Sequence, residues 1–72
     1  MEDFISFAAM VLGVPSETLS AETACGDIAE WDSVMHLRLV METEARYGVS
    51  IALEDIPGMR TLADFARAAG VP

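Results

Sequence analysis

Hydrophobic residues recur every three or four positions in three segments of the chain, and this spacing predicts three amphipathic helices. The first helix runs from about Asp3 to Leu12, with Asp3 as its cap and Gly13 and Pro15 ending it. Two sets of apolar positions fit the helical period, so the apolar stripe of this helix is wide. The sets are Phe4, Phe7, Ala8 and Val11, and Ile5, Ala9 and Leu12.

The second helix has the clearest boundaries in the pattern. It runs from about Ser33 to Tyr47, follows Asp32 in the N-cap position, and ends at Gly48, a residue typical of the position after a helix. One broad apolar face is expected, made of Val34, Leu37, Val40, Met41 and Tyr47.

The last helix opens with a capping box from Thr61 to Asp64 and is closed by Gly70. Its apolar positions predict a core-facing stripe of Leu62, Phe65, Ala66 and Ala69.

The segments between the helices are of three kinds. They are a long loop over residues 15–30 that Leu19 and Ile28 hold to the core, an extended link at Val49–Leu53, and a single helical turn at Glu54–Met59 that contains Pro57 and Gly58.

These elements predict an all-α fold, a small three- to four-helix bundle that forms one domain over residues 1–72. A chain of 72 residues has room for one thin core and little room for a substrate pocket, which favours a binding or carrier module over an enzyme. Its start at Met1 and the lack of a linker favour a free-standing protein. A monomer is expected.

Charge and cysteine content narrow the function classes further. Twelve acidic residues against four basic ones give a net charge of −8, which disfavours binding to nucleic acid and to anionic membranes. No apolar run reaches the length of a membrane span. The single cysteine, Cys25, allows no internal disulfide and suits a reducing cytoplasm, where we expect the protein to reside.

Candidate chemistry is concentrated in one segment, Glu30–Leu37. Ser33 stands at the very start of the long second helix, where unpaired backbone N–H groups and the helix dipole favour an anion. A phosphate ester on the Ser33 hydroxyl would therefore lie where the backbone tolerates its charge. The local pattern also fits a serine that only caps the helix.

The run Asp32-Ser33-Val34, with Glu44, Tyr47 and Gly48 downstream and Thr61 opening the last helix, resembles the acyl carrier protein family. The resemblance covers about Phe4 to Ala69 and extends to the length and the acidity of the chain. It implies that a phosphopantetheinyl transferase attaches a 4′-phosphopantetheine arm from coenzyme A to Ser33. It also implies that the thiol of this arm holds an acyl or aminoacyl group as a thioester, that Asp32 belongs to the attachment motif, and that the protein itself does not catalyse.

The resemblance further implies that the second helix is the docking surface for the transferase, the loading enzyme and the downstream pathway enzymes. We expect these contacts at Trp31, Val34, Met35, Arg38, Leu39 and Glu42. Several of these positions depart from the family pattern. Trp31 replaces the usual glycine, Val34 the usual leucine, and Met35 and Arg38 occupy commonly acidic positions, which favours a specialised polyketide or nonribosomal type of pathway.

Alternative interpretations stay open at this point. The chain could be an unmodified acidic helical adaptor for a partner protein. Asp32, Ser33 and His36 are the residue types of a hydrolase triad, although a solvent-facing His36 is the favoured interpretation. Trp31 could be an interface anchor, but a half-exposed ring that staples the loop to the helix is favoured. Asp27, Glu30 and Asp32 could hold a cation weakly, yet a solvated acidic edge is favoured, so no metal site is expected.

Overall fold

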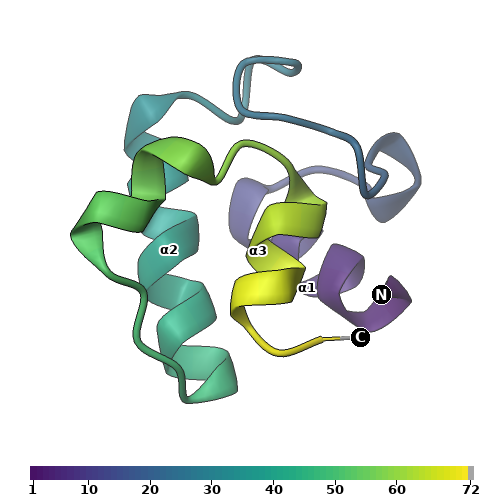
Figure 1. Ribbon diagram of the computed structural model, residues 1–72. Helices are drawn as coiled ribbons and strands as arrows, with labels where there is room; N and C mark the ends of the chain where they lie inside the picture. The colour runs from purple at the N-terminus through teal and green to yellow at the C-terminus, as the bar shows by residue number, and fades with distance from the viewer. Residues whose placement is uncertain (72) are drawn as a thin grey trace.

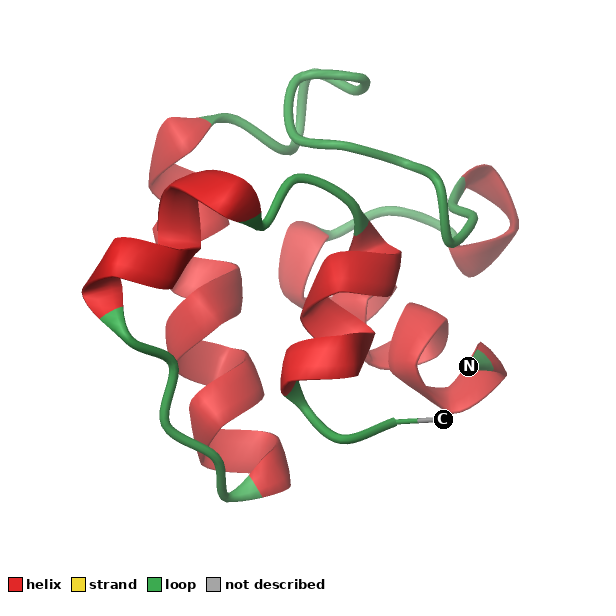
Figure 2. Cartoon of the chain, viewed as in Figure 1, coloured by secondary structure: helices red, strands yellow, loops and turns green. Residues whose placement is uncertain are grey.

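The fold is helical throughout, as the hydrophobic pattern predicts. The computed structural model describes residues 1–71, which contain three α-helices and two short 3₁₀ helices joined by loops (Figures 1 and 2). In chain order these are α1 (Glu2–Leu12), η1 (Ser16–Thr18), α2 (Ser33–Tyr47), η2 (Leu53–Gly58) and α3 (Leu62–Ala68). Over residues 1–71 the β structure amounts to an isolated bridge between Ala24 and Thr61. The expected all-α bundle is therefore confirmed.

The helix boundaries follow from capping at both ends of α2. The Asp32 side chain accepts a hydrogen bond from the Met35 backbone N–H at 2.9 Å, so it satisfies one of the donors that the first turn leaves free. At the other end, Gly48 adopts a left-handed conformation with φ 65°, and its N–H donates to the Glu44 carbonyl. Both caps were expected from the sequence.

The start of α3 is fixed by the predicted capping box. The Asp64 backbone N–H donates to the Thr61 hydroxyl at 3.2 Å, and the Asp64 carboxylate accepts from the Thr61 N–H at 3.1 Å. The carboxylate also accepts from the Arg60 N–H at 2.9 Å and pairs with Arg67. These backbone hydrogen bonds, first that of Arg60 and then that of Thr61, hold the pKa of Asp64 below its ordinary value of 3.8.

The core is formed by the inner faces of the three α-helices and by Leu19, Trp31 and Met59 from the segments between them. Its largest fully buried apolar side chains are Phe4, Trp31, Leu39, Leu62 and Phe65. Tyr47 at the end of α2 adds an aromatic contact with α1, because its ring centroid lies 5.6 Å from that of Phe4 and 5.7 Å from that of Phe7.

The face of α2 that packs on the core differs from the expected one. Leu39, Val40 and Thr43 are the buried residues of this helix, whereas three members of the expected apolar face lie in solvent. The exposed side chains are Val34 (74% exposed), Leu37 (53%) and Met41 (65%). Both sets of positions satisfy the helical period, so periodicity alone could not choose between them.

The long loop before α2 is held in place by backbone hydrogen bonds to α3 and to the residues just before it. The Leu62 N–H donates to the Thr23 carbonyl at 3.0 Å, and the Cys25 N–H donates to the Arg60 carbonyl at 3.0 Å. Leu19 is buried and Ile28 packs partly against the core, as expected. The loop therefore runs over the ends of the helices as an ordered segment (Figure 1).

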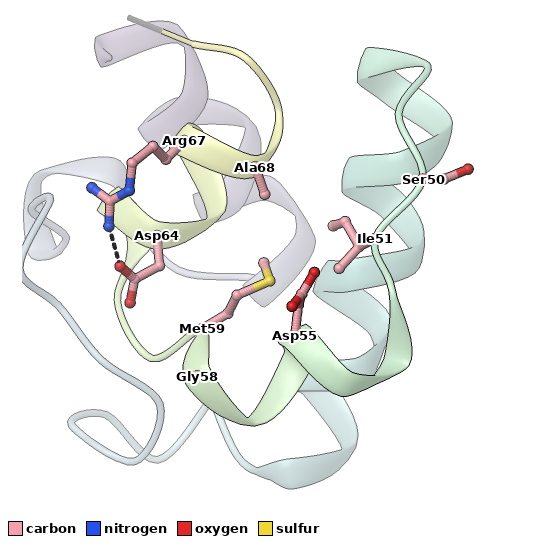
Figure 3. Close-up of a pocket in the computed structure, with 8 residues that line it drawn as sticks. All are labelled: Ser50, Ile51, Asp55, Gly58, Met59, Asp64, Arg67 and Ala68. Carbon is pink, nitrogen blue, oxygen red and sulfur yellow. Dashed lines mark hydrogen bonds and ion pairs between the residues drawn. The ribbon is translucent and has the colours of Figure 1, made fainter.

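The expected turn at 54–59 is the 3₁₀ helix η2, which lies across α2 near its N-terminal end (Figures 1 and 3). Pro57 occurs near the end of η2 instead of near its start. A short 3₁₀ helix tolerates this placement because few of its N–H groups need an acceptor within the helix.

The division of α2 can be tested with two leucines on opposite faces. We expect Leu39→Ala to lower the free energy of unfolding by about 2–5 kcal/mol, because it opens a cavity in the core. Leu37→Ala serves as the matched control and changes it by about 0.5 kcal/mol at most, since Leu37 is exposed. Urea denaturation followed by circular dichroism measures both, and equal losses would contradict this placement of α2.

The low pKa of Asp64 makes part of the stability depend on pH. The stabilisation is fully present above the ordinary carboxyl pKa of 3.8 and is lost as the pH falls through the lower folded value. At pH 7 we expect Asp64→Asn to cost about 0.3–1 kcal/mol, and this difference from the wild type narrows on acidification. Glu22→Gln in the exposed loop is the control. The test is the urea unfolding midpoint of the wild type and of each variant, measured across the acidic pH range. A stability difference between the wild type and Asp64→Asn that widens toward low pH would refute the lowered pKa of Asp64.

Candidate functional site

Ser33 is the first residue of α2, and its side chain is exposed. Asp32 before it has an extended backbone, while the Asp32 carbonyl accepts from the His36 N–H at 2.8 Å and starts the helical ladder. The N–H groups of Ser33 and Val34 precede this ladder, so they have no acceptor within the helix. The Ser33 hydroxyl therefore lies at the positive end of a fifteen-residue helix, where a phosphate group is favoured.

Trp31 joins the loop to the first turn of α2. Its indole Nε1–H donates to Nδ1 of His36 at 3.1 Å, and the two rings stack with centroids 5.8 Å apart. Phe65 of α3 meets both rings edge-on, at 6.0 Å from Trp31 and 5.2 Å from His36. The pairing of the residue before the cap with the fourth residue of the helix is the staple that the sequence favoured.

Two expectations about this cluster are corrected by the structure. The Trp31 side chain is 0% exposed, so it is neither half-exposed nor available to a partner. His36 is partly buried between two aromatic rings instead of facing solvent. The physical reason is the same for both: the indole N–H needs an acceptor when the ring is buried, and His36 supplies it.

The geometry gives no support to a catalytic triad. The Nδ1 atom of His36 accepts from Trp31, and the Asp32 carboxylate accepts from the Met35 N–H, so neither group is engaged as a triad requires. A metal site also finds no support, since no group of three or more potential ligands occurs among residues 1–71. Asp27 instead accepts from the Ala24 N–H at 2.8 Å within its own turn.

Residues 1–71 include no helix with the length and hydrophobicity of a membrane span.

The expected partner-binding residues on α2 are divided by the structure. Val34 and Arg38 are exposed, while Met35 and Glu42 are half-buried at the edge of the core. The Arg38 Nε atom lies 3.7 Å from a Glu42 carboxylate oxygen and forms an exposed ion pair. The expectation that Leu39 contacts partners is wrong, because this side chain is 0% exposed and belongs to the core.

The apolar strip, defined here as Val34, Leu37 and Met41, begins next to Ser33 and follows the exposed face of α2. Leu53 at the start of η2 is also largely exposed. Leu37 and Leu53 were not expected at a binding surface. The available indication was that α2 carries more apolar positions than one buried stripe can hold.

An open pocket of about 530 Å³ lies between η2, α3 and the link before η2 (Figure 3). Ile51 and Met59 extend into it, while the Asp64–Arg67 ion pair lies on its opposite side. Its lining residues are Ser50, Ile51, Asp55, Gly58, Met59, Asp64, Arg67 and Ala68. The pocket thus combines an apolar wall with a charged rim.

Comparison with known protein families decides what this arrangement is. Residues 3–69 match the family described as a phosphopantetheine attachment site, which covers nearly the whole chain. The chain belongs to this family. Its resemblance to acyl carrier proteins and its all-α carrier fold are thereby confirmed, and 4′-phosphopantetheine is its covalent cofactor. Proteins of this kind carry their cargo and do not catalyse, so the chain is a carrier and not an enzyme.

Similar curated proteins are meromycolate extension acyl carrier proteins of mycobacteria. Those of Mycobacterium leprae and of Mycobacterium tuberculosis strain H37Rv are each 33% identical over 54 residues, which is 75% of this chain and 47% of theirs. The Mycolicibacterium smegmatis protein has the same identity, over 54% of its length. The chain thus spans about half the length of the curated relatives it matches. No solved structure matches it at a significant level.

Proposed function

We propose that Ser33 is the residue that carries the phosphopantetheine arm. The observation that supports it best is the exposed hydroxyl at the first position of α2, inside the segment that matches the attachment family. An ester formed there places the phosphate charge beside the free N–H groups of the first turn. The arm supplies a terminal thiol that holds the cargo as a thioester.

The residues around Ser33 have separate tasks in this proposal. Asp32 keeps its carboxylate on the Met35 N–H and so keeps the helix start ordered before and after modification. Trp31 and His36 fix the loop that leads into α2. The side chain of Ser33 remains in solvent, where a transferase can reach it.

The cargo in this proposal is an acyl or aminoacyl group of a specialised biosynthetic pathway, of the polyketide or nonribosomal type. The departures from the family pattern at Met35 and Arg38, which occupy commonly acidic positions, support a specialised pathway, because charges at the rim of an interface select partners. The names of the relatives favour acyl over aminoacyl cargo, since those proteins are acyl carriers of meromycolate extension.

The docking surface in this proposal is the apolar strip with the Arg38–Glu42 pair beside it. It would serve the phosphopantetheinyl transferase, the loading enzyme and the downstream enzymes in turn. A rigid helix face next to the attachment site suits this use, since exposed apolar side chains supply contact area without unsatisfied polar groups.

We further propose that the protein acts as a monomer in the reducing cytoplasm, which suits the single free thiol of Cys25.

Attachment at Ser33 is tested by intact mass after incubation with coenzyme A and a broad-specificity phosphopantetheinyl transferase. We expect the wild type to gain one phosphopantetheine and Ser33→Ala to gain none, because among residues 1–71 no other hydroxyl residue begins an α-helix. Ser50→Ala, which removes another exposed serine, is the matched control and should gain one. If the folded wild type stays unmodified while a known carrier reacts in parallel, the adaptor interpretation takes precedence.

Docking on the strip is tested with two methionines of similar exposure. We expect Met41→Glu to lower kcat/KM for modification of Ser33 about tenfold, which corresponds to about 1.4 kcal/mol of lost contact energy. Met10→Glu on α1, where Met10 is 71% exposed and Met41 65%, should stay within about twofold. Equal effects of the two substitutions would exclude the strip as the transferase contact.

A further inference from the structure

Two hydrogen bonds join residues on either side of Ser33 and Val34 in the sequence, one pair lying inside the other. The inner one joins the Asp32 carboxylate to the Met35 N–H at 2.9 Å, and the outer one joins the Trp31 indole to His36 Nδ1 at 3.1 Å. The inner bond is an ordinary helix cap, whereas the outer one depends on an unprotonated Nδ1 of the His36 imidazole. The start of α2 is therefore held by a bond that protonation of His36 would break.

The outer bond requires one particular form of the His36 ring. Because the indole N–H is always a donor, Nδ1 must offer its lone pair, and the proton of the neutral ring is on Nε2. Protonation of Nδ1 would direct two N–H groups toward each other. The buried indole has no water to replace His36, so the rings would have to separate.

Separation of these rings would extend beyond the two residues. The Trp31 carbonyl accepts from the Gly26 N–H at 2.9 Å, so movement of Trp31 would also loosen the turn at Gly26 within the long loop. Phe65 of α3 contacts both rings and would lose one of them. Ser33 lies between the two partners in the chain and would lose its fixed position.

We propose that His36 is a positioning residue for the modification of Ser33, acting through the Trp31 indole, and that protonation of its Nδ1 slows the attachment of phosphopantetheine. This inference rests on the proposed function of Ser33. His36 does not touch the reacting atoms in it. It holds the loop that sets the approach to the hydroxyl.

The rings packed on His36 carry no charge, and the Cys25 thiol lies one contact further out, where it donates to the Trp31 carbonyl at 3.5 Å. The loop presents the uncharged Trp31 ring, flanked in the chain by the carboxylates of Glu30 and Asp32, and α3 presents the Phe65 ring. The Asp32 carboxylate caps α2 and is bound to the Met35 N–H, while that of Asp64 beside Phe65 is held in the capping box. The Arg60 and Thr61 N–H groups hold the pKa of Asp64 below its ordinary value, so that carboxylate keeps its charge over the pH range of the test.

The test compares three forms of the full chain with one transferase between pH 8 and pH 5. His36→Asn places a carbonyl oxygen where Nδ1 is and does not titrate, so it keeps an acceptor for the indole at every pH. His36→Phe keeps the aromatic packing and removes the acceptor. Dividing the wild-type rate by that of His36→Asn cancels the pH dependence of the transferase itself.

We expect the ratio of wild-type to His36→Asn rates to be constant near pH 8 and to fall about fivefold or more toward pH 5. His36→Phe should be modified about tenfold more slowly than His36→Asn at every pH. Circular dichroism establishes that each form is folded. The faster modification of His36→Asn than of His36→Phe would show that the hydrogen-bond acceptor, and not the aromatic ring, is what the reaction needs. A ratio that stays constant with pH, or equal rates for His36→Phe and His36→Asn, would overturn the proposal.

An independent measurement separates failure of this inference from failure of the proposed function. Trp31 is the single tryptophan of the chain, so its indole N–H gives one assignable nuclear magnetic resonance signal. We expect this signal to shift between pH 8 and pH 5 in the wild type and not in His36→Asn. A shift without a change in the modification ratio overturns the positioning role, whereas a wild type that is never modified overturns the proposed function.

Discussion

Burial of the Trp31 indole is the contact on which the rest of the arrangement depends. The ring comes from a loop, yet it is fully enclosed and meets His36 of α2 and Phe65 of α3. A chain of 72 residues with one cysteine has no disulfide to fix a long loop and must do so by packing. One large side chain therefore fixes the loop, sets the start of α2 and joins two helices.

The second constraint is the rotation of α2 about its own axis. Leu39, Val40 and Thr43 face the core, which leaves the apolar strip of Val34, Leu37 and Met41 in solvent. Had the helix turned the strip inward, Leu39, Val40 and Thr43 would lie in solvent. This helix therefore has two apolar faces, of which one forms the fold and the other stays exposed.

The sequence predicted most of what is determined locally and missed what is determined by packing. The cap expected at Asp3 is wrong, because α1 begins at Glu2 with Met1 in the N-cap position and has no side-chain cap. The caps at Asp32 and Gly48 and the capping box at Thr61 were correct, because each depends on residues a few positions apart. Ser33 was identified at the helix start for the same reason, and the family match then supported the carrier interpretation of the chain.

The burial of Trp31 and Leu39 could not be derived in this way, since it depends on which of two stripes meets α1 and α3. His36 was misplaced because its partner is a buried donor, and the sequence alone does not show that the donor is buried. A staple of Trp31 onto the helix was expected, but neither its partner His36 nor its hydrogen bond was.

The exposed strip also has a consequence for how copies of the protein behave toward one another. An apolar surface on a small protein invites self-association, and the strip would be a natural contact between two copies. The net charge of −8 opposes such a contact through mutual repulsion, which acts over about 8 Å at physiological salt. The acidity of this chain thus favours colloidal stability, because it opposes contact between the exposed strips of two copies in a crowded solution.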